Sequence, residues 1–397
     1  MTEFRFDPRR FQASPAVCWL LGAAFGPPES VGCFELVNPD ELLATGDRLD
    51  LLQRAGARID GHVLAASIGK AAGDEIAARV RSTAGHALRV RASTGKVGRI
   101  AWAEGIDSVV IKGGALLLLD AVPPGARNVG DLDVLVPKGC AERMQTALID
   151  AGWVASDLPE SGHQLPILGH PSGVPVEVHV EIPGVKLGVG NATTEEVIAT
   201  GLCRQGVGLP EGCRVVSIDL LLAHLIVHGI HQHGLAPGAY PMARMLADVQ
   251  DLVPSQIEWE RFLGGGFRWI SHVVSRREAE AVWAVVDRLG GGENPEAVMG
   301  GNDDAGSLLQ HIVNGALDDE YCQGLNLQNV VRASGDSSWF YVGKKALFLT
   351  RGQIDIVYGK PTTELGYLGR RLWRPFDLTL RAWRYGWAWV KHKVRHR

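Results

Sequence analysis

The sequence has few of the features that mark secreted, membrane-spanning or strongly basic proteins. Its six cysteines are scattered over 397 residues and none forms a Cys-x-x-Cys pair, which fits a reducing cytoplasm better than a disulfide-rich secreted scaffold. No apolar run approaches the roughly 20 residues that a membrane-spanning helix requires. The formal net charge of −4 provides no global basic field that would attract nucleic acid. We therefore expect a cytoplasmic globular protein.

One apolar segment near the start of the chain imitates a signal peptide. The run AVCWLLGAAF over residues 16–25 follows Arg9 and Arg10. It lacks a clear small-residue cleavage site before Pro27 and Pro28, so we interpret it as a buried first helix.

Composition and hydrophobic spacing divide the chain into regions. With 46% apolar and 21% charged residues, it is an ordinary globular sequence, long enough for two or three domains. Apolar residues at helical spacing predict a helical region over 1–100, and a second one over 186–290. Strands and helices are expected to mix over 101–185. A stretch rich in Gly, Asn and Asp over 290–307 predicts a loop or linker before a C-terminal region over 308–397.

The mixed region is predicted to form a small sheet. Apolar runs bounded by turn residues predict helices at 114–119 and 139–151 and strands at 107–112, 131–136, 153–156, 165–169 and 174–182. Farther along, Ser217 is expected to cap the long apolar helix that follows it. The predicted fold class is α+β, with a small mixed sheet flanked by N- and C-terminal helical regions.

Two aspartates separated by one residue are the most informative feature of the chain. Asp131 and Asp133 lie in RNVGDLDVLVP, where side chains alternate across a strand, so both carboxylates share one face. Two carboxylates on a rigid element suit a hard cation such as Mg²⁺ and metal-assisted phosphoryl or nucleotidyl transfer. The spacing alone also occurs in hairpin turns, calcium loops and sugar-transfer enzymes, so the neighbouring segments decide its interpretation.

A glycine turn precedes the aspartate pair. In SVVIKGGALLLLD a short strand ends at Lys112, and Gly113 and Gly114 open an apolar helix. Glycines let the backbone approach a ligand closely, and free amides at a helix start favour an anion. Lys112 and Arg127 add the cations that a triphosphate needs, although each has an alternative role as a structural partner of the acidic residues.

An acidic strand follows the pair. In GVPVEVHVEIPG the valines occupy one face, and Glu177, His179 and Glu181 occupy the other. Glu177 is a candidate third carboxylate, either as a metal ligand or as a general base. His179 is a candidate for orienting a ligand, with a structural histidine as the alternative.

In this order of elements the chain resembles the DNA polymerase beta-type nucleotidyltransferase superfamily, and within it an uncharacterised bacterial nucleotidyltransferase family. The matching residues are Lys112-Gly113, Arg127, Asp131-Leu132-Asp133 and Glu177-Val178-His179, followed by His228-Gly229-Ile230-His231, Arg244 and Asp248. The motif position favours Glu177 over Glu181 as the third acid. One departure is Gly114, which stands where the superfamily usually has a serine that touches phosphate.

The resemblance implies a polymerase beta-like core and an enzyme that uses Mg²⁺, with Mn²⁺ as an alternative, to move a nucleoside monophosphate from an NTP such as ATP to an acceptor. The acceptor, whether protein, peptide, RNA or small molecule, stays open. The implied catalytic residues, which are also the metal ligands, are Asp131, Asp133 and Glu177. The implied nucleotide-binding residues are Lys112, Gly113, Gly114 and Arg127. The histidines His179, His228 and His231 are given supporting roles near the site. The alternatives are a non-catalytic nucleotide-binding or regulatory protein, which the missing serine favours, and a metal-dependent phosphate or sugar transferase.

Three further patterns have simpler interpretations. His224, His228 and His231 follow i, i+4, i+7 spacing, for which a hydrogen-bonded histidine face is favoured over a zinc site. Arg244 and Asp248 are expected to pair with each other. The tail over 369–397 is rich in Lys, Arg and Trp. Packing on the protein body is favoured there over peripheral contact with an anionic membrane or with nucleic acid.

Overall fold

The computed structural model describes residues 14–27, 37–156, 162–170, 173–205, 209, 212–232 and 242–317, and farther along 363, 366, 368–374 and 376. The first half of the described chain contains α1 (Pro15–Phe25), α2 (Pro39–Leu49), α3 (Leu52–Arg58), α4 (Gly61–Ile68), α5 (Lys70–Ala103), α6 (Lys112–Leu118) and α7 (Ala141–Asp150). The second half contains α8 (Thr194–Ala199), α9 (Ile218–Val227), α10 (Met242–Leu252), α11 (Gln256–Gly264), α12 (Arg276–Gly290), α13 (Pro295–Gly300) and α14 (Asp304–Leu317). Short 3₁₀ or π turns are η2 (Lys138–Cys140), η3 (His228–Gln232) and η4 (Gly266–Trp269).

The strands form one mixed sheet of seven in the order β3-β4-β5-β2-β1-β7-β6. Their bounds are β1 Val109–Val110, β2 Leu132–Leu135, β3 Val154–Ala155, β4 Leu168–Gly169, β5 Val176–His179, β6 Cys203–Arg204 and β7 Arg214–Val216. At the centre, β2 runs parallel to β5 and antiparallel to β1, while β1 runs parallel to β7. A small mixed sheet with many helices confirms the predicted α+β class.

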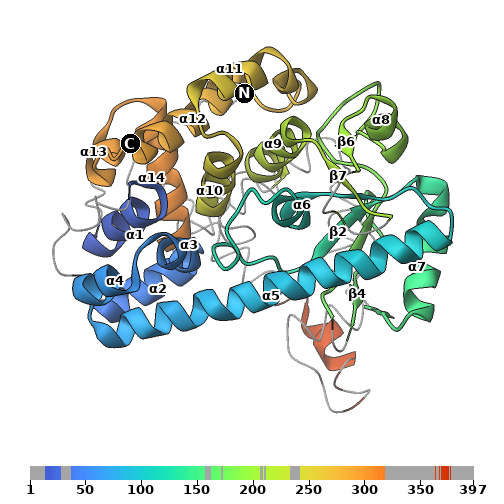
Figure 1. Ribbon diagram of the computed structural model, residues 1–397, viewed down its shortest axis with the longest axis horizontal. Coiled ribbons are helices and arrows are strands. Elements are labelled where there is room, and N and C mark those ends of the chain that lie inside the picture. The colour runs from blue at the N-terminus through green and yellow to red at the C-terminus, as the bar shows by residue number, and fades with distance from the viewer. Residues whose placement is uncertain are drawn as a thin grey trace.

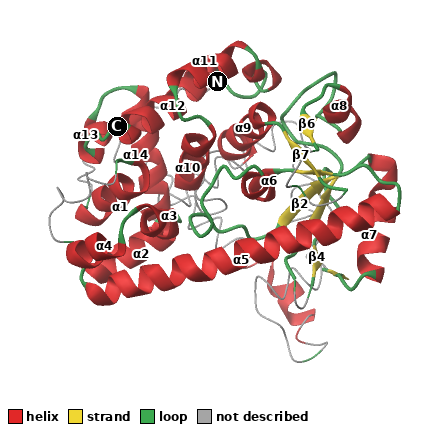
Figure 2. Cartoon of the chain, viewed as in Figure 1, coloured by secondary structure: helices red, strands yellow, loops and turns green. Residues whose placement is uncertain are grey.

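Helix α5 connects the two ends of the molecule (Figure 1). It runs from the group of helices that includes α1–α4 to the sheet, where it passes close to α7. Helices α6, α9 and α10 lie between the sheet and the group that α12–α14 form with α1. Figure 2 shows the strands gathered at one end, with helices around them. The sheet that carries the aspartate pair is therefore enclosed by helices from distant parts of the sequence.

Local sequence explains several element boundaries. Ser217 caps α9, as predicted, because its hydroxyl accepts a hydrogen bond from the Leu220 amide. The helix expected at 139–151 is present as η2 followed by α7, and Gly152 follows it with a positive φ of 102° that suits glycine. The interpretation of 16–25 as a buried first helix is also confirmed, since every residue from Ala16 to Phe25 is buried in α1.

Two parts of the secondary-structure prediction were wrong. Strands β6 and β7 lie in a region expected to be helical. The prediction missed them because runs of two and three residues are too short to show an alternating pattern. Helix α13 and the first turn of α14 occupy part of the segment 290–307, which was expected to be a loop. There Asn294 caps α13 and Pro295 fills its first position, so the polar residues mark a helix start rather than a linker.

No helix within the described ranges combines the length and the apolar character that crossing a membrane requires. Of the basic Trp-rich tail, residues 368–374 are helical and Trp373 stacks on Phe376. The rest of that tail lies outside the described residues, as do most residues of the proposed C-terminal region.

Candidate active site

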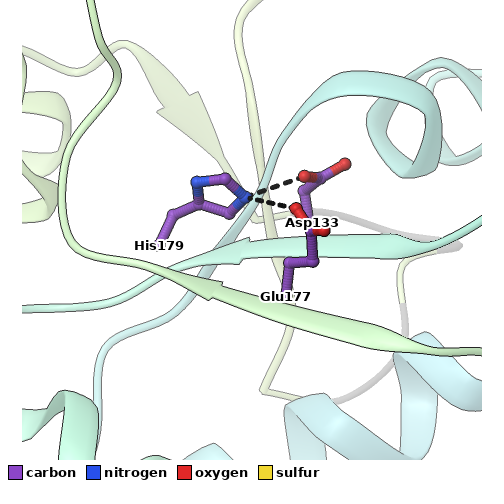
Figure 3. A group of neighbouring side chains, drawn as sticks. All are labelled: Asp133, Glu177 and His179. Atoms are coloured by element: carbon purple, nitrogen blue, oxygen red, sulfur yellow. Dashed lines mark hydrogen bonds and ion pairs between the residues drawn. The ribbon is translucent and has the colours of Figure 1, made fainter. Parts of the chain in front are cut away.

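Strand pairing brings two of the three predicted carboxylates together. Because β2 and β5 are parallel neighbours, Asp133 lies opposite Glu177 in the sheet register, and Leu135 lies opposite His179. Residues opposite each other on neighbouring strands share a face of the sheet, so Asp133 and Glu177 project together. Figure 3 shows their side chains converging with the imidazole of His179, which follows Glu177 by two positions on the same face.

Asp133 is the centre of the cluster. Its side chain is buried, and its Oδ1 accepts hydrogen bonds from Lys112 Nζ at 2.7 Å and from His179 Nε2 at 2.8 Å. The same His179 nitrogen lies 3.3 Å from Glu177 Oε2 (Figure 3). Carboxylate oxygens only accept, so His179 Nε2 carries the proton that it shares between the two acids.

The local charges explain the protonation states of these groups. Burial opposes the charged carboxylate, but the Lys112 ammonium and the His179 hydrogen bond hold the pKa of Asp133 well below its usual range. Burial likewise opposes the charged forms of His179 and Lys112, yet the hydrogen bonds to Asp133 and Glu177 raise the pKa of His179. The charge of Asp133 raises the pKa of Lys112. Asp133 is therefore an anion held between the Lys112 ammonium and the His179 imidazole.

Asp131 occupies a different environment from Asp133. It immediately precedes β2 and is partly buried. Burial, followed by the negative charges of Asp133 and Glu177, raises the pKa of Asp131 to about 7. The positive charges of Lys112 and His179 lower the pKa of Asp131 by less than these effects raise it, so Asp131 is less well compensated than Asp133. A cation bound between these carboxylates would supply further positive charge.

The segment leading to Asp131 is held on both sides. From α5, His86 Nε2 contacts the Val129 carbonyl at 2.6 Å. The Leu132 amide donates to the Pro175 carbonyl at 2.8 Å, directly before β5. These contacts fix where the Asp-x-Asp segment enters the sheet.

The glycine turn lies against the same strands. Lys112 has a φ of 49°, a left-handed conformation that non-glycine residues rarely adopt, and this conformation accompanies the contact between its ammonium and Asp133. A Cβ atom on Gly114 would lie 2.9 Å from Val110 Cγ1 and 3.0 Å from Leu132 Cδ1. Close packing of α6 on the sheet thus leaves no room for a side chain at the position where the superfamily that the sequence resembles usually has a serine.

Arg127 pairs with an aspartate outside the acidic cluster. Its Nε and Nη2 donate to the two carboxylate oxygens of Asp248 on α10, at 2.7 and 2.9 Å, and both side chains are buried. A Cβ on Gly113 would lie 2.5 Å from Arg127 Nη1, so the absence of a side chain at Gly113 admits the guanidinium. Arg244, which was expected to pair with Asp248, forms its ion pair with Asp50.

This ion pair belongs to a larger group of buried charges. Three ion pairs line a small cavity of about 10 Å³: Arg54 with Asp251, Arg127 with Asp248, and Arg244 with Asp50. The group joins the glycine turn to α10 and to the N-terminal helices. It is structural support for the site and is not part of the acidic cluster.

The histidines of α9 and η3 are not arranged as an i, i+4, i+7 face. The α-helix ends at Val227, and the π turn η3 changes the spacing of the residues after it. His224 is buried with neither ring nitrogen hydrogen-bonded, and its ring lies edge-on to that of His228. His228 Nδ1 contacts Gln232 Oε1 at 2.6 Å, and His231 is exposed. Within the described residues, none of these three belongs to a metal-competent group.

The metal-competent group in the described part of the chain is Asp133, Glu177 and His179, whose ligand atoms lie within 4.8 Å of one another. Two carboxylates and an imidazole suit Mg²⁺ or Mn²⁺, and the imidazole widens the choice toward other transition metals. The predicted trio differs in one member, since it contained Asp131 in place of His179. The only sign in the sequence that His179 lies near the carboxylates was its position on the same strand face as Glu177.

The fold and site together define a mixed α/β protein with a buried acidic cluster next to a glycine turn. The chain belongs to a family of uncharacterised nucleotidyltransferases, which it matches over residues 35–267. That match covers the helices α2–α5 before the sheet, the whole acidic cluster and the helices α9 and α10. The chain has no significant match among curated proteins or among solved structures.

Proposed function

We propose that the protein is a Mg²⁺-dependent nucleotidyltransferase of the polymerase beta-like type that transfers a nucleoside monophosphate from an NTP to an acceptor. The observation that carries the proposal is the register that sets Asp133 opposite Glu177, with Lys112 donating to Asp133. Family membership supports the reaction class. The cluster supports metal-assisted chemistry, because carboxylates this close need a compensating cation.

In this proposal each residue of the cluster has a distinct role. Asp131, Asp133 and Glu177 would hold the metal, which when bound neutralises charge on the triphosphate. Lys112 exchanges its contact with Asp133 for a phosphate oxygen of the nucleotide, at the turn that Gly113 and Gly114 continue into α6. Arg127 contributes indirectly, since its guanidinium is engaged by Asp248 and supports the turn.

The reaction would form one P–O bond and break another. The acceptor oxygen attacks the α-phosphorus, the bond from that phosphorus to the bridging oxygen breaks, and pyrophosphate leaves. Glu177 is the proposed acceptor of the proton lost by the attacking hydroxyl, because it is the least buried carboxylate of the metal-competent group. His179 shares a proton between Asp133 and Glu177 and so holds both carboxylates in place.

Thermal-shift measurements with each NTP, with and without Mg²⁺, test the proposal. A ligand that binds only the native state raises the melting temperature, by an amount that grows with its concentration relative to Kd. We expect a Mg²⁺-dependent shift that disappears in Asp131→Asn/Asp133→Asn and in Glu177→Gln. The matched control Asp150→Asn/Asp287→Asn, which changes two exposed aspartates on α7 and α12, should keep it.

Product analysis with NTP labelled at the α-phosphate separates the proposed reaction from the alternatives. Transfer of the α-label to an acceptor together with release of pyrophosphate identifies nucleotidyl transfer. A Mg²⁺-dependent shift without turnover would favour a non-catalytic nucleotide-binding protein, for which the existing neutralisation of Asp133 by Lys112 and His179 is the supporting observation. A wild-type protein that no nucleotide stabilises would refute both.

A further inference from the structure

A second pocket lies outside the acidic cluster. It is formed by the loop after β5, by residues that follow α8, and by η4 with the turn after it. Its volume is about 480 Å³, within the range of small-molecule sites, which is roughly 300–1,000 Å³. The lining residues are Lys186, Leu187, Gly188, Thr200, Leu202, Arg268, Trp269 and His272. None of them belongs to the proposed catalytic machinery.

Backbone contacts fix the two sides of this pocket relative to each other. The Lys186 amide donates to the Trp269 carbonyl at 2.9 Å, which joins the loop after β5 directly to η4. The Ala192 amide closes the same loop by donating to the Val185 carbonyl at 2.7 Å. On the third side, a capping box between Thr193 and Glu196 fixes the start of α8. The pocket is therefore a built feature of the fold.

The lining carries two cationic side chains. Lys186 and Arg268 are exposed, and neither forms an ion pair with any described residue. No carboxylate belongs to the lining. Glu196 adjoins the lining at Gly188, where a Cβ atom would lie 2.5 Å from its Oε1, and its Oε2 accepts from the Thr193 amide. Two unpaired cations at one pocket repel each other unless an anion lies between them.

The remaining lining groups suit a ligand with a polar and an apolar part. The Thr200 hydroxyl donates to the Glu196 carbonyl at 2.6 Å, so its oxygen faces the pocket as an acceptor. Leu187 and Leu202 provide apolar surface on the other walls. Burial, followed by the charges of Lys186 and His231, lowers the pKa of His272, so its ring is a neutral hydrogen-bonding group near pH 7.

We propose that this pocket binds a small phosphate-bearing ligand at a site separate from the acidic cluster. An arginine fork and a lysine point charge together match the double negative charge and several acceptor oxygens of a phosphate group. The leucines contact the organic part of the ligand. This inference does not depend on nucleotide transfer, because none of its contacts involves Asp131, Asp133 or Glu177.

Isothermal titration with pyrophosphate in metal-free buffer at 150 mM NaCl tests the site. Wild-type protein should bind one equivalent saturably, and Lys186→Gln/Arg268→Gln should bind at least tenfold more weakly. The control Lys70→Gln/Arg276→Gln removes the same charge from two exposed helical positions and should bind like wild type. Lys112→Gln, which removes the phosphate-binding cation proposed for the acidic cluster, should also bind pyrophosphate like wild type, which separates this proposal from the catalytic one.

Three results would overturn the proposal: no saturable binding to wild type, equal weakening in the control double variant, or loss of binding in Lys112→Gln alone. The first would mean that the pocket holds no phosphate, and the second would mean that only overall charge matters. The third would place the anion at the acidic cluster. Both substituted cations are exposed, and the single variant Arg268→Gln repeats the test if the double variant does not fold.

Discussion

Arg127 binds Asp248 through two parallel hydrogen bonds that join positions 121 residues apart in the sequence. Both side chains are buried, so their charges are removed from water and depend on each other. The pair connects the segment beside the glycine turn to α10. It thereby holds together the part of the chain that carries Lys112 and the helices on the other side of the core.

Removing one partner of this pair should destabilise the protein strongly. Asp248→Asn leaves the Arg127 guanidinium buried with a weaker acceptor, and we expect a loss of about 3–5 kcal/mol in the free energy of unfolding. Urea denaturation followed by circular dichroism measures it. As a control, Arg276→Gln removes an exposed i,i+4 pair with Glu280 and should cost less than about 1 kcal/mol. Equal costs for the two variants would contradict the structural role of the pair.

Introducing a serine at Gly114, as in the superfamily that the sequence resembles, should not be tolerated. In Gly114→Ser the new side chain would press on Val110 and Leu132, so we expect a loss of about 1–3 kcal/mol. The matched control is Gly139→Ala in η2, where a Cβ atom meets no atom within 4 Å. Differential scanning calorimetry should show a lower melting temperature for Gly114→Ser alone. A variant as stable as wild type would mean that α6 moves away from the sheet to accept the hydroxyl.

The raised pKa of Asp131 predicts a pH-dependent stability in metal-free buffer. The folded-state pKa is about 7, whereas the ordinary value is 3.8, so the folded protein binds more protons between these values. The contribution of this carboxyl to stability is therefore present at low pH and is lost as the pH rises from about 4 to about 7. Asp131→Asn should remove this slope, by comparison of urea midpoints over that range. Mg²⁺ should also flatten it if the metal binds the ionised carboxylate, and a slope unchanged by Asp131→Asn would refute the assignment.

The sequence was sufficient to predict the face that carries the acidic residues but not the contacts they make. Alternation within β5 places Glu177 and His179 together, and the Asp-x-Asp spacing does the same for Asp131 and Asp133. The parallel register of β2 and β5 depends on sheet order, which a local pattern does not encode. Lys112 reaches Asp133 across 21 residues of chain, and this contact follows from the left-handed backbone at Lys112.

Long-range charge pairing was the least predictable part of the site. Arg244 and Asp248 have the i, i+4 spacing of a helical pair, yet Asp248 receives Arg127 and Arg244 pairs with Asp50. Local spacing predicts neighbours on an exposed helix, whereas a buried carboxylate takes the partner that best satisfies both of its oxygens. The interruption of the histidine face by η3 has a similar cause, since a π turn leaves no clear signal in residue spacing.

His224 offers a test of whether a buried polar group near the cluster is structural or functional. Its imidazole is buried without a hydrogen bond at either nitrogen, and burial, followed by the positive charge of Lys112, lowers its pKa well below the ordinary value. Replacing a buried unsatisfied polar group by an apolar one of similar size is neutral or stabilising, so His224→Leu should gain up to about 1–3 kcal/mol in urea denaturation. Val227→Ala, which truncates a buried side chain of the same helix, should instead lose stability. A destabilised His224→Leu would show that the imidazole makes a favourable contact in solution. If the variant is as stable as wild type but nucleotide with Mg²⁺ no longer raises its melting temperature, His224 belongs to the nucleotide site.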